Sequence, residues 1–112
     1  MASKQLSTYT NVKVTKVKTV TDQNGKEKGV RGFMKVYDED GQYQFGRAFS
    51  IWENKVADFE NLKELVQPRR VVQDGMELED TERQLKKVSG AHVDRWTKGG
   101  PTYHNFEIVA AE

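Results

Sequence analysis

The sequence predicts an all-β fold with one helix: a small barrel of five strands, in which the helix lies between the third and fourth strands. The 112 residues are 36% hydrophobic and 31% charged, which suits a small barrel with a large hydrated surface better than an enzyme with buried parallel strands. Most of the chain alternates apolar and polar residues, and one segment has helical spacing. No linker or internal repeat divides it, so we expect a single domain over residues 1–112.

Three strands are expected in the first half. Residues 1–10 have little pattern and are expected to be a flexible lead-in. Residues 11–21 alternate at Val12 and Val14, and the broken spacing that follows predicts a bulge or a strong curl. Asn24-Gly25 favours a tight turn into a second strand over residues 28–38. A turn at residues 38–42 then leads to a third strand over residues 43–52.

The helix and two more strands make up the second half. Apolar residues recur at helical spacing in residues 54–67, with Asn54 as the expected N-cap and Pro68 as the stop. Residues 68–84 leave two alternatives open: a short strand at residues 70–72 with an acidic loop, or a short second helix. Residues 85–96 and 102–110 predict the last two strands, joined by a turn at residues 97–101.

Composition excludes several kinds of site. Cysteine is absent, which rules out disulfides, thiol nucleophiles and cysteine zinc sites. The opening Met-Ala-Ser-Lys-Gln does not resemble a signal peptide, and no apolar run approaches the roughly 18 residues of a membrane span. We therefore expect a cytoplasmic protein with no membrane partner.

Charge is distributed unevenly along the chain. The net charge is only +1, but residues 1–35 carry +6, residues 36–85 carry −6 and residues 86–112 carry +1. A protein that is nearly neutral overall can still bind phosphates through a basic face. Solvated strand faces are the alternative explanation of the same pattern.

The order of three strands, a helix and two strands is that of the OB-fold, a small and partly open barrel. Phe-Gly-Arg-Ala-Phe-Ser-Ile-Trp at residues 45–52, followed by Lys-Val-Ala at 55–57, resembles the third strand and helix entry of bacterial and phage single-stranded DNA-binding proteins. Residues 87–90 resemble the fourth strand of that family, residues 95–100 its tryptophan-bearing hairpin tip and residues 105–110 its fifth strand. Residues 68–84 depart from the family because they are longer and more acidic than its usual link.

The resemblance implies non-catalytic, largely sequence-independent binding of single-stranded DNA, in replication, recombination or repair. It also implies a bacterial cell or a phage-infected host and no cofactor. Whether the chain forms a homo-oligomer is left open. So are two alternatives: single-stranded RNA as the ligand, and a protein-interaction adaptor of the same fold that recognises its partner through the helix and the acidic residues 74–82.

The second and third strands predict the binding face. Arg31, Phe33, Lys35 and Tyr37 alternate with apolar residues, so they share one side of the sheet. A five-residue turn would set Tyr37 opposite Tyr43, Lys35 opposite Phe45 and Phe33 opposite Arg47. Aromatic rings stack on bases while lysine and arginine contact phosphates, so this combination is typical of single-strand binding.

A buried position for the aromatic side chains is the competing interpretation. It would also bury Arg31, Lys35 and Arg47 without evident partners, which is costly. A bulge near Gly46 or Ala48 is therefore expected. It would turn Phe49 and Ile51 inward and leave Tyr37, Tyr43 and Phe45 outward, while Trp52 at the strand-to-helix junction is expected to fill the core.

The final hairpin supplies the other predicted contacts. Trp96 stands before a Lys-Gly-Gly-Pro turn and beside Arg95 and Lys98, where an exposed indole can stack on a base. Lys13, Lys16 and Lys18 could extend the phosphate track, but solvated lysines are common on strands. The candidate nucleic-acid-binding residues are Arg31, Phe33, Lys35, Tyr37, Tyr43, Phe45, Arg47, Arg95, Trp96 and Lys98.

Catalytic and metal sites have little support in the sequence. His92 and His104 are the only histidines and lack a fixed carboxylate partner, so polar strand positions explain them better than a metal pair. Ser50 and Ser89 lack the context of a nucleophile elbow. The acids of residues 77–82 lack calcium-loop spacing. We expect no enzyme, no metal and no cofactor.

Overall fold

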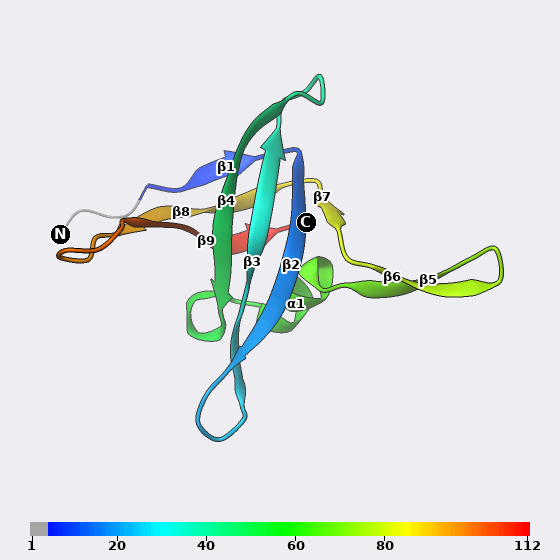
Figure 1. The fold of residues 1–112 in the computed structure, drawn as a ribbon, viewed down its shortest axis with the longest axis horizontal. Helices are drawn as coiled ribbons and strands as arrows, with labels where there is room; N and C mark the ends of the chain where they lie inside the picture. The colour runs from blue at the N-terminus through cyan, green and yellow to red at the C-terminus, as the bar shows by residue number, and fades with distance from the viewer. Residues whose placement is uncertain (1–4) are drawn as a thin grey trace.

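The computed structural model describes residues 5–112, and these form one seven-stranded sheet, a separate two-stranded sheet and a short helix (Figure 1). The large sheet has the order β1-β8-β9-β4-β3-β2-β7, and all its pairings are antiparallel except that of β4 with β9. The elements are β1 Ser7–Tyr9, β2 Val12–Thr21, β3 Glu27–Tyr37, β4 Tyr43–Trp52, the 3-10 helix η1 Glu53–Lys55, α1 Phe59–Val66, β5 Arg69–Gln73, β6 Met76–Asp80, β7 Arg83–Leu85, β8 Val88–Arg95 and β9 Tyr103–Ala111.

The predicted five-stranded OB-fold barrel is wrong. The large sheet is mixed, because β4 and β9 run parallel. Among residues 5–112 no pairing joins its two edge strands, β1 and β7, so the sheet does not close into a barrel. The helix follows the fourth strand in chain order rather than the third. The additional strands β1 and β7 have three residues each, too few for alternation to appear in the sequence. Residues 1–4 of the expected lead-in lie outside the described residues, whereas residues 7–9 form β1.

Two aspartates build the turns that align the three central strands. Asp22 accepts hydrogen bonds from the backbone N–H groups of Asn24 and Lys26, at 2.8 and 3.0 Å. Asp38 does the same for residues 40 and 42, at 2.9 and 2.8 Å. A glycine with positive φ completes each turn, at residues 25 and 41. Of the bulge or strong curl expected in residues 11–21, the bulge is found, because the register of β2 on β3 shifts between Thr15 and Lys18.

The core lies between one side of the sheet and α1. Val12, Met34, Phe49, Ile51 and Phe106 are 0–1% exposed and come from four different strands. Phe59, Leu62 and Val66 of α1 pack into the same cluster. We call the side of the sheet that faces this cluster the inner face and the opposite side the outer face.

The helix is shorter than the sequence predicts. Asp58, rather than Asn54, is its N-cap and accepts a hydrogen bond from the backbone of Asn61 at 3.2 Å. The backbone at Val56 is extended and separates η1 from α1. In residues 5–112 no helix is both long enough and apolar enough to cross a membrane.

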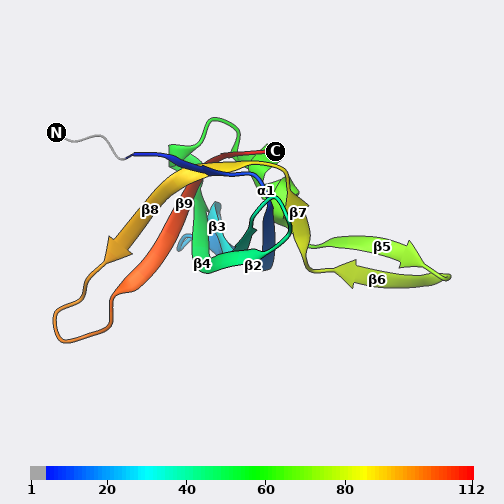
Figure 2. The ribbon, with the colours of Figure 1, turned by 90° about the horizontal axis from the view of Figure 1, so that it is seen from above.

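The strands β5 and β6 pair only with each other and project from the body as an arm (Figures 1 and 2). Asp74 and Gly75 have φ angles of 55° and 75° at the tip, as a tight two-residue hairpin turn requires. Of the two alternatives for residues 68–84, the short strand is therefore the correct one. The acidic residues after it form a second strand, rather than a loop.

Candidate nucleic-acid interface

The outer face of β3 carries the residues that the sequence placed there. Val30, Met34 and Val36 are buried on the inner face, so the alternating residues Arg31, Phe33, Lys35 and Tyr37 lie on the outer face. On β2, Lys13 pairs with Lys35 and Lys18 pairs with Arg31, which brings two further cations to this face.

Strand β4 meets β3 in a different register from the predicted one. Gln44 is an extra residue between the pairs Val36–Phe45 and Tyr37–Tyr43, so the bulge lies two residues before Gly46. Tyr37 and Tyr43 are opposite each other as predicted, with ring centroids 5.8 Å apart. The other two predicted pairings are wrong, because Lys35 lies opposite Gly46 and Phe33 opposite Ala48.

This register moves Phe45 and Arg47 to the inner face. Phe45 packs against the core cluster and lies edge-on to Tyr9, with ring centroids 5.2 Å apart. Arg47 lies opposite Met34, its side chain is 18% exposed and it forms an ion pair with Asp94. The expected outward position of Phe45 is therefore wrong, whereas the expected inward positions of Phe49 and Ile51 are confirmed.

Gly46 makes room for the aromatic side chains of the outer face. A Cβ atom at this position would lie 2.7 Å from ring carbons of Phe33 and 2.7 Å from the hydroxyl oxygen of Tyr43. Those distances are too short for a real contact, so only glycine lets Phe33 lie across the strand. Phe33, Tyr43 and Tyr37 thus form one aromatic patch beside Lys35.

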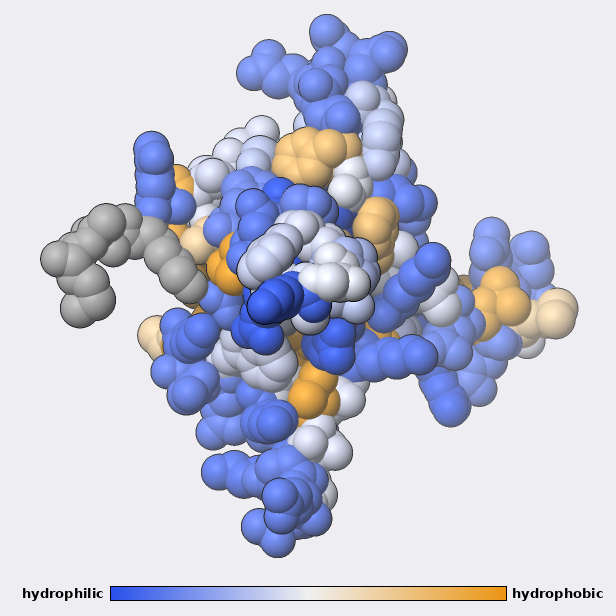
Figure 3. Space-filling view, turned by 60° about the vertical axis from the view of Figure 1, so that its left-hand side comes forward, coloured by the Kyte–Doolittle hydropathy of each residue, from blue (hydrophilic) through white to orange (hydrophobic). Residues whose placement is uncertain are grey.

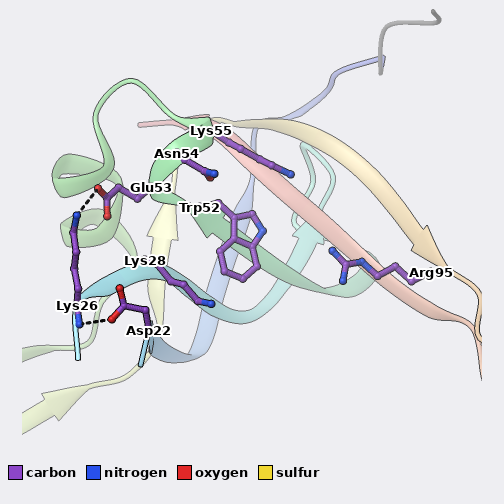
Figure 4. A pocket seen from close by; sticks show the side chains of 8 residues that line it. All are labelled: Asp22, Lys26, Lys28, Trp52, Glu53, Asn54, Lys55 and Arg95. Atoms are coloured by element: carbon purple, nitrogen blue, oxygen red, sulfur yellow. Dashed lines mark hydrogen bonds and ion pairs between the residues drawn. The ribbon is translucent and has the colours of Figure 1, made fainter. Parts of the chain in front are cut away.

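Trp52 forms a second patch at the other end of β4. Its ring covers Gly29, where a Cβ atom would meet ring carbons at 2.5 and 2.8 Å. Figure 4 shows the indole between Lys28, Lys55 and Arg95, which line a surface hollow of about 400 Å³ with it. The expected role of Trp52 as a core plug is wrong: it is half-buried and lies outside the core cluster. The alternation itself could have shown this, because Trp52 follows the buried Ile51.

The outer face continues onto the last hairpin. Strand β9 runs parallel to β4 with Asn105 beside Ala48, and the Asn105 amide donates to the Ser50 hydroxyl at 2.8 Å. Arg95 pairs with Tyr103 near the tip, on the side opposite the buried Phe106. Tyr103, which the sequence interpretation missed, is 60% exposed. Trp96 is 73% exposed and lies beside Arg95, and Lys98 is exposed in the turn.

Most cations of the outer face have no acidic partner. Within residues 5–112, Lys18, Lys28, Arg31 and Arg95 form no ion pair. Lys13 and Lys35 share Glu82, at 3.8 and 4.0 Å. The Lys13 ammonium also lies 5.4 Å from the ring centroid of Tyr37. Six cations therefore lie among the aromatic side chains of the outer face, and Glu82 competes with phosphates for two of them, Lys13 and Lys35.

Replacing Glu82 by glutamine is expected to tighten binding of single-stranded DNA about two- to fivefold, because it frees Lys13 and Lys35 for phosphates and an exposed ion pair contributes up to about 1 kcal/mol. Fluorescence anisotropy with a labelled dT oligomer measures the change. Glu64→Gln makes the same change of charge on α1. If both variants tighten binding equally, net charge alone explains the effect.

The inner face carries a polar cluster next to the core. Asp94 pairs with Arg47 and lies 2.7 Å from His104 Nδ1, and these contacts, the His104 hydrogen bond first, lower the pKa of Asp94. His92 Nε2 lies 2.6 Å from the Tyr9 hydroxyl. Burial, followed by the charge of Arg47, lowers the pKa of His92.

Residues 5–112 contain neither a three-residue metal cluster nor a serine placed beside a histidine. In the described part of the chain no three His, Cys, Asp or Glu residues are placed to hold a metal ion. Ser50 is engaged by Asn105 at 2.8 Å, and the Ser89 hydroxyl lies 2.9 Å from that of Thr8. Neither serine hydroxyl is hydrogen-bonded to a histidine.

Lowering the pH from about 7 to about 5 is expected to reduce the free energy of unfolding through His92. Its pKa is lower in the folded chain than in the unfolded chain, so the unfolded chain takes up the proton first as the pH falls. Urea unfolding across this range measures the slope. His92→Gln should make the slope shallower, and an unchanged slope in this variant would contradict the assignment.

Comparison with models of known protein families and with curated protein sequences gives no match. The resemblance to single-stranded DNA-binding proteins therefore stays a prediction from short motifs. The functional argument depends on the geometry and charge of the outer face.

Proposed function

We propose that this protein binds single-stranded DNA on its outer face, without catalysis and with little sequence preference. The observation that carries the proposal is that half-buried and exposed aromatic side chains and cations without an ion pair lie on the same side of β2, β3, β4, β9 and β8. The short sequence motifs of the DNA-binding family support it further. Replication, recombination or repair in the cytoplasm of a bacterial or phage-infected cell is the setting that this resemblance suggests.

Aromatic side chains that can stack on bases lie at both ends of β4. Phe33, Tyr37 and Tyr43 offer flat rings at one end of β4, and Trp52 offers one at the other end. Tyr103 adds an exposed ring on the last hairpin, opposite Arg95. Stacking contributes about 1–3 kcal/mol per base and accepts any base, since each base has a π-face. Lys18, Lys28, Arg31 and Arg95 are placed beside these rings to contact phosphates.

Titration of a fluorescein-labelled dT oligomer at several salt concentrations tests the proposal. The affinity should fall with salt, with a log–log slope of about 0.7 per phosphate contact. A duplex of the same length should bind more weakly, because its bases cannot stack on the protein. Absence of salt-dependent binding in low salt would overturn the proposal. Competition with an rU oligomer decides between DNA and RNA, and a clear preference for rU would replace DNA by RNA as the ligand.

A further inference from the structure

The β5–β6 arm exposes apolar side chains that nothing in the described chain covers. Val72 is 77% exposed, Met76 63% and Leu78 41%. They lie on a 12-residue hairpin that shares no backbone pairing with the large sheet. In Figure 3 the arm projects to the right and carries hydrophobic atoms among hydrophilic ones. An isolated two-stranded hairpin is only marginally stable in water, so a covering partner would stabilise it.

The charge of the arm indicates what kind of surface would cover it. Residues 71–82 contain five acids and no basic residue, and Arg69 and Arg70 at the base of the arm are paired with Asp80 and Glu77 at 3.5 and 3.1 Å. A complementary surface is therefore basic and offers apolar contacts. The outer face has both properties, and Glu82 from the same acidic segment already pairs with Lys13 and Lys35 of that face.

We propose that the arm of one copy of this chain docks on the outer face of a second copy, and that single-stranded DNA displaces it. Within one copy the arm points away from the sheet, so its own outer face is not what it covers (Figures 1 and 2). The acids of the arm take the place of phosphates, and its apolar side chains take the place of bases. The argument for self-association uses only the properties of the arm and the outer face. Displacement by DNA rests in addition on the proposed function.

Sedimentation velocity of the full chain over a range of concentrations tests the association. In low salt the protein should associate, and high salt should return it to the monomer. A dT oligomer of about eight nucleotides, short enough for one copy, should also return it to the monomer. A chain that stays monomeric in low salt at every concentration overturns the proposal. If the oligomer does not reverse the association, the arm and the DNA do not compete for the same surface, and displacement by DNA is overturned.

Variants on both sides of the contact make the test specific. Glu77→Gln with Glu79→Gln should weaken association about tenfold, because two exposed charge contacts with the second copy are lost. Lys18→Gln with Arg31→Gln should weaken it by a similar factor. Glu39→Gln with Glu64→Gln removes the same charge elsewhere and should leave association unchanged; an equal loss there overturns the arm as the docking element.

DNA titration of the Glu77→Gln/Glu79→Gln variant separates the two proposals. It should bind the dT oligomer at least as tightly as the unmodified protein, since the arm no longer competes. If it associates weakly and fails to bind DNA, the proposed function fails while the docking of the arm stands. Circular dichroism confirms that each variant is folded.

Discussion

Phe33→Ala is expected to weaken binding of single-stranded DNA about 5- to 150-fold, which corresponds to the loss of about 1–3 kcal/mol for one stacked base. Phe33 lies on the outer face beside Thr15 of β2 and Ala48 of β4, outside the core cluster, so its removal leaves the packing of that cluster unchanged. Anisotropy titration with a dT oligomer measures the loss, and urea unfolding shows whether stability is retained.

Phe45→Ala is the matched control, because it removes the same side chain from the inner face of the adjacent strand. Phe45 packs against Tyr9 and the core, so its loss should lower the free energy of unfolding by about 1–3 kcal/mol, less than for a fully buried phenylalanine. DNA affinity of the folded variant should stay within about twofold of the original, since Phe45 does not reach the outer face. If both variants lost affinity equally, binding would not be specific to the outer face, which would contradict the proposed interface.

Gly90→Ala is expected to destabilise the fold by about 3 kcal/mol or more, or to prevent folding. A Cβ atom at this buried position would lie 2.2 Å from the backbone oxygen of Glu107 and 2.8 Å from the ring of Phe106. The Glu107 oxygen cannot move without separating β8 from β9, and that pairing holds the second half of the outer face. Thermal and urea unfolding measure the effect.

Gly100→Ala is the control for that substitution. Gly100 lies in the turn of the same hairpin, where the nearest atom to an added Cβ is 3.5 Å away, an ordinary contact. Its stability should change by less than about 0.5 kcal/mol. If Gly90→Ala is as stable as Gly100→Ala, the close approach of Gly90 to Glu107 described above is contradicted.

The long strands could be predicted from the sequence because their residues alternate over many positions. The predicted strands at residues 28–38 and 43–52 differ from β3 and β4 by at most one residue at either end. Closure of the sheet could not be predicted in this way. It depends on whether the edge strands β1 and β7 pair, and three residues carry no pattern that specifies a partner.

The candidate site was only partly predictable for a related reason. Alternation on β3 is unbroken, so the positions of Phe33, Lys35 and Tyr37 followed from it. On β4 one extra residue, Gln44, reverses the phase relative to the turn, and the sequence does not show on which side of Gly46 the bulge falls. The sequence therefore predicts Phe45 and Arg47 on the outer face, and it predicts Trp52 in the core because large apolar residues usually lie there.

The most direct measurement of the central claim is the fluorescence of Trp52 during titration with a dT oligomer. In the Trp96→Phe variant Trp52 is the only tryptophan, and its half-buried indole lies in the basic hollow of the outer face. Its emission should be quenched in proportion to binding, and salt should reverse the quenching. An unchanged emission while the oligomer binds, or no binding in low salt, would contradict the assignment of the outer face as the site for single-stranded DNA.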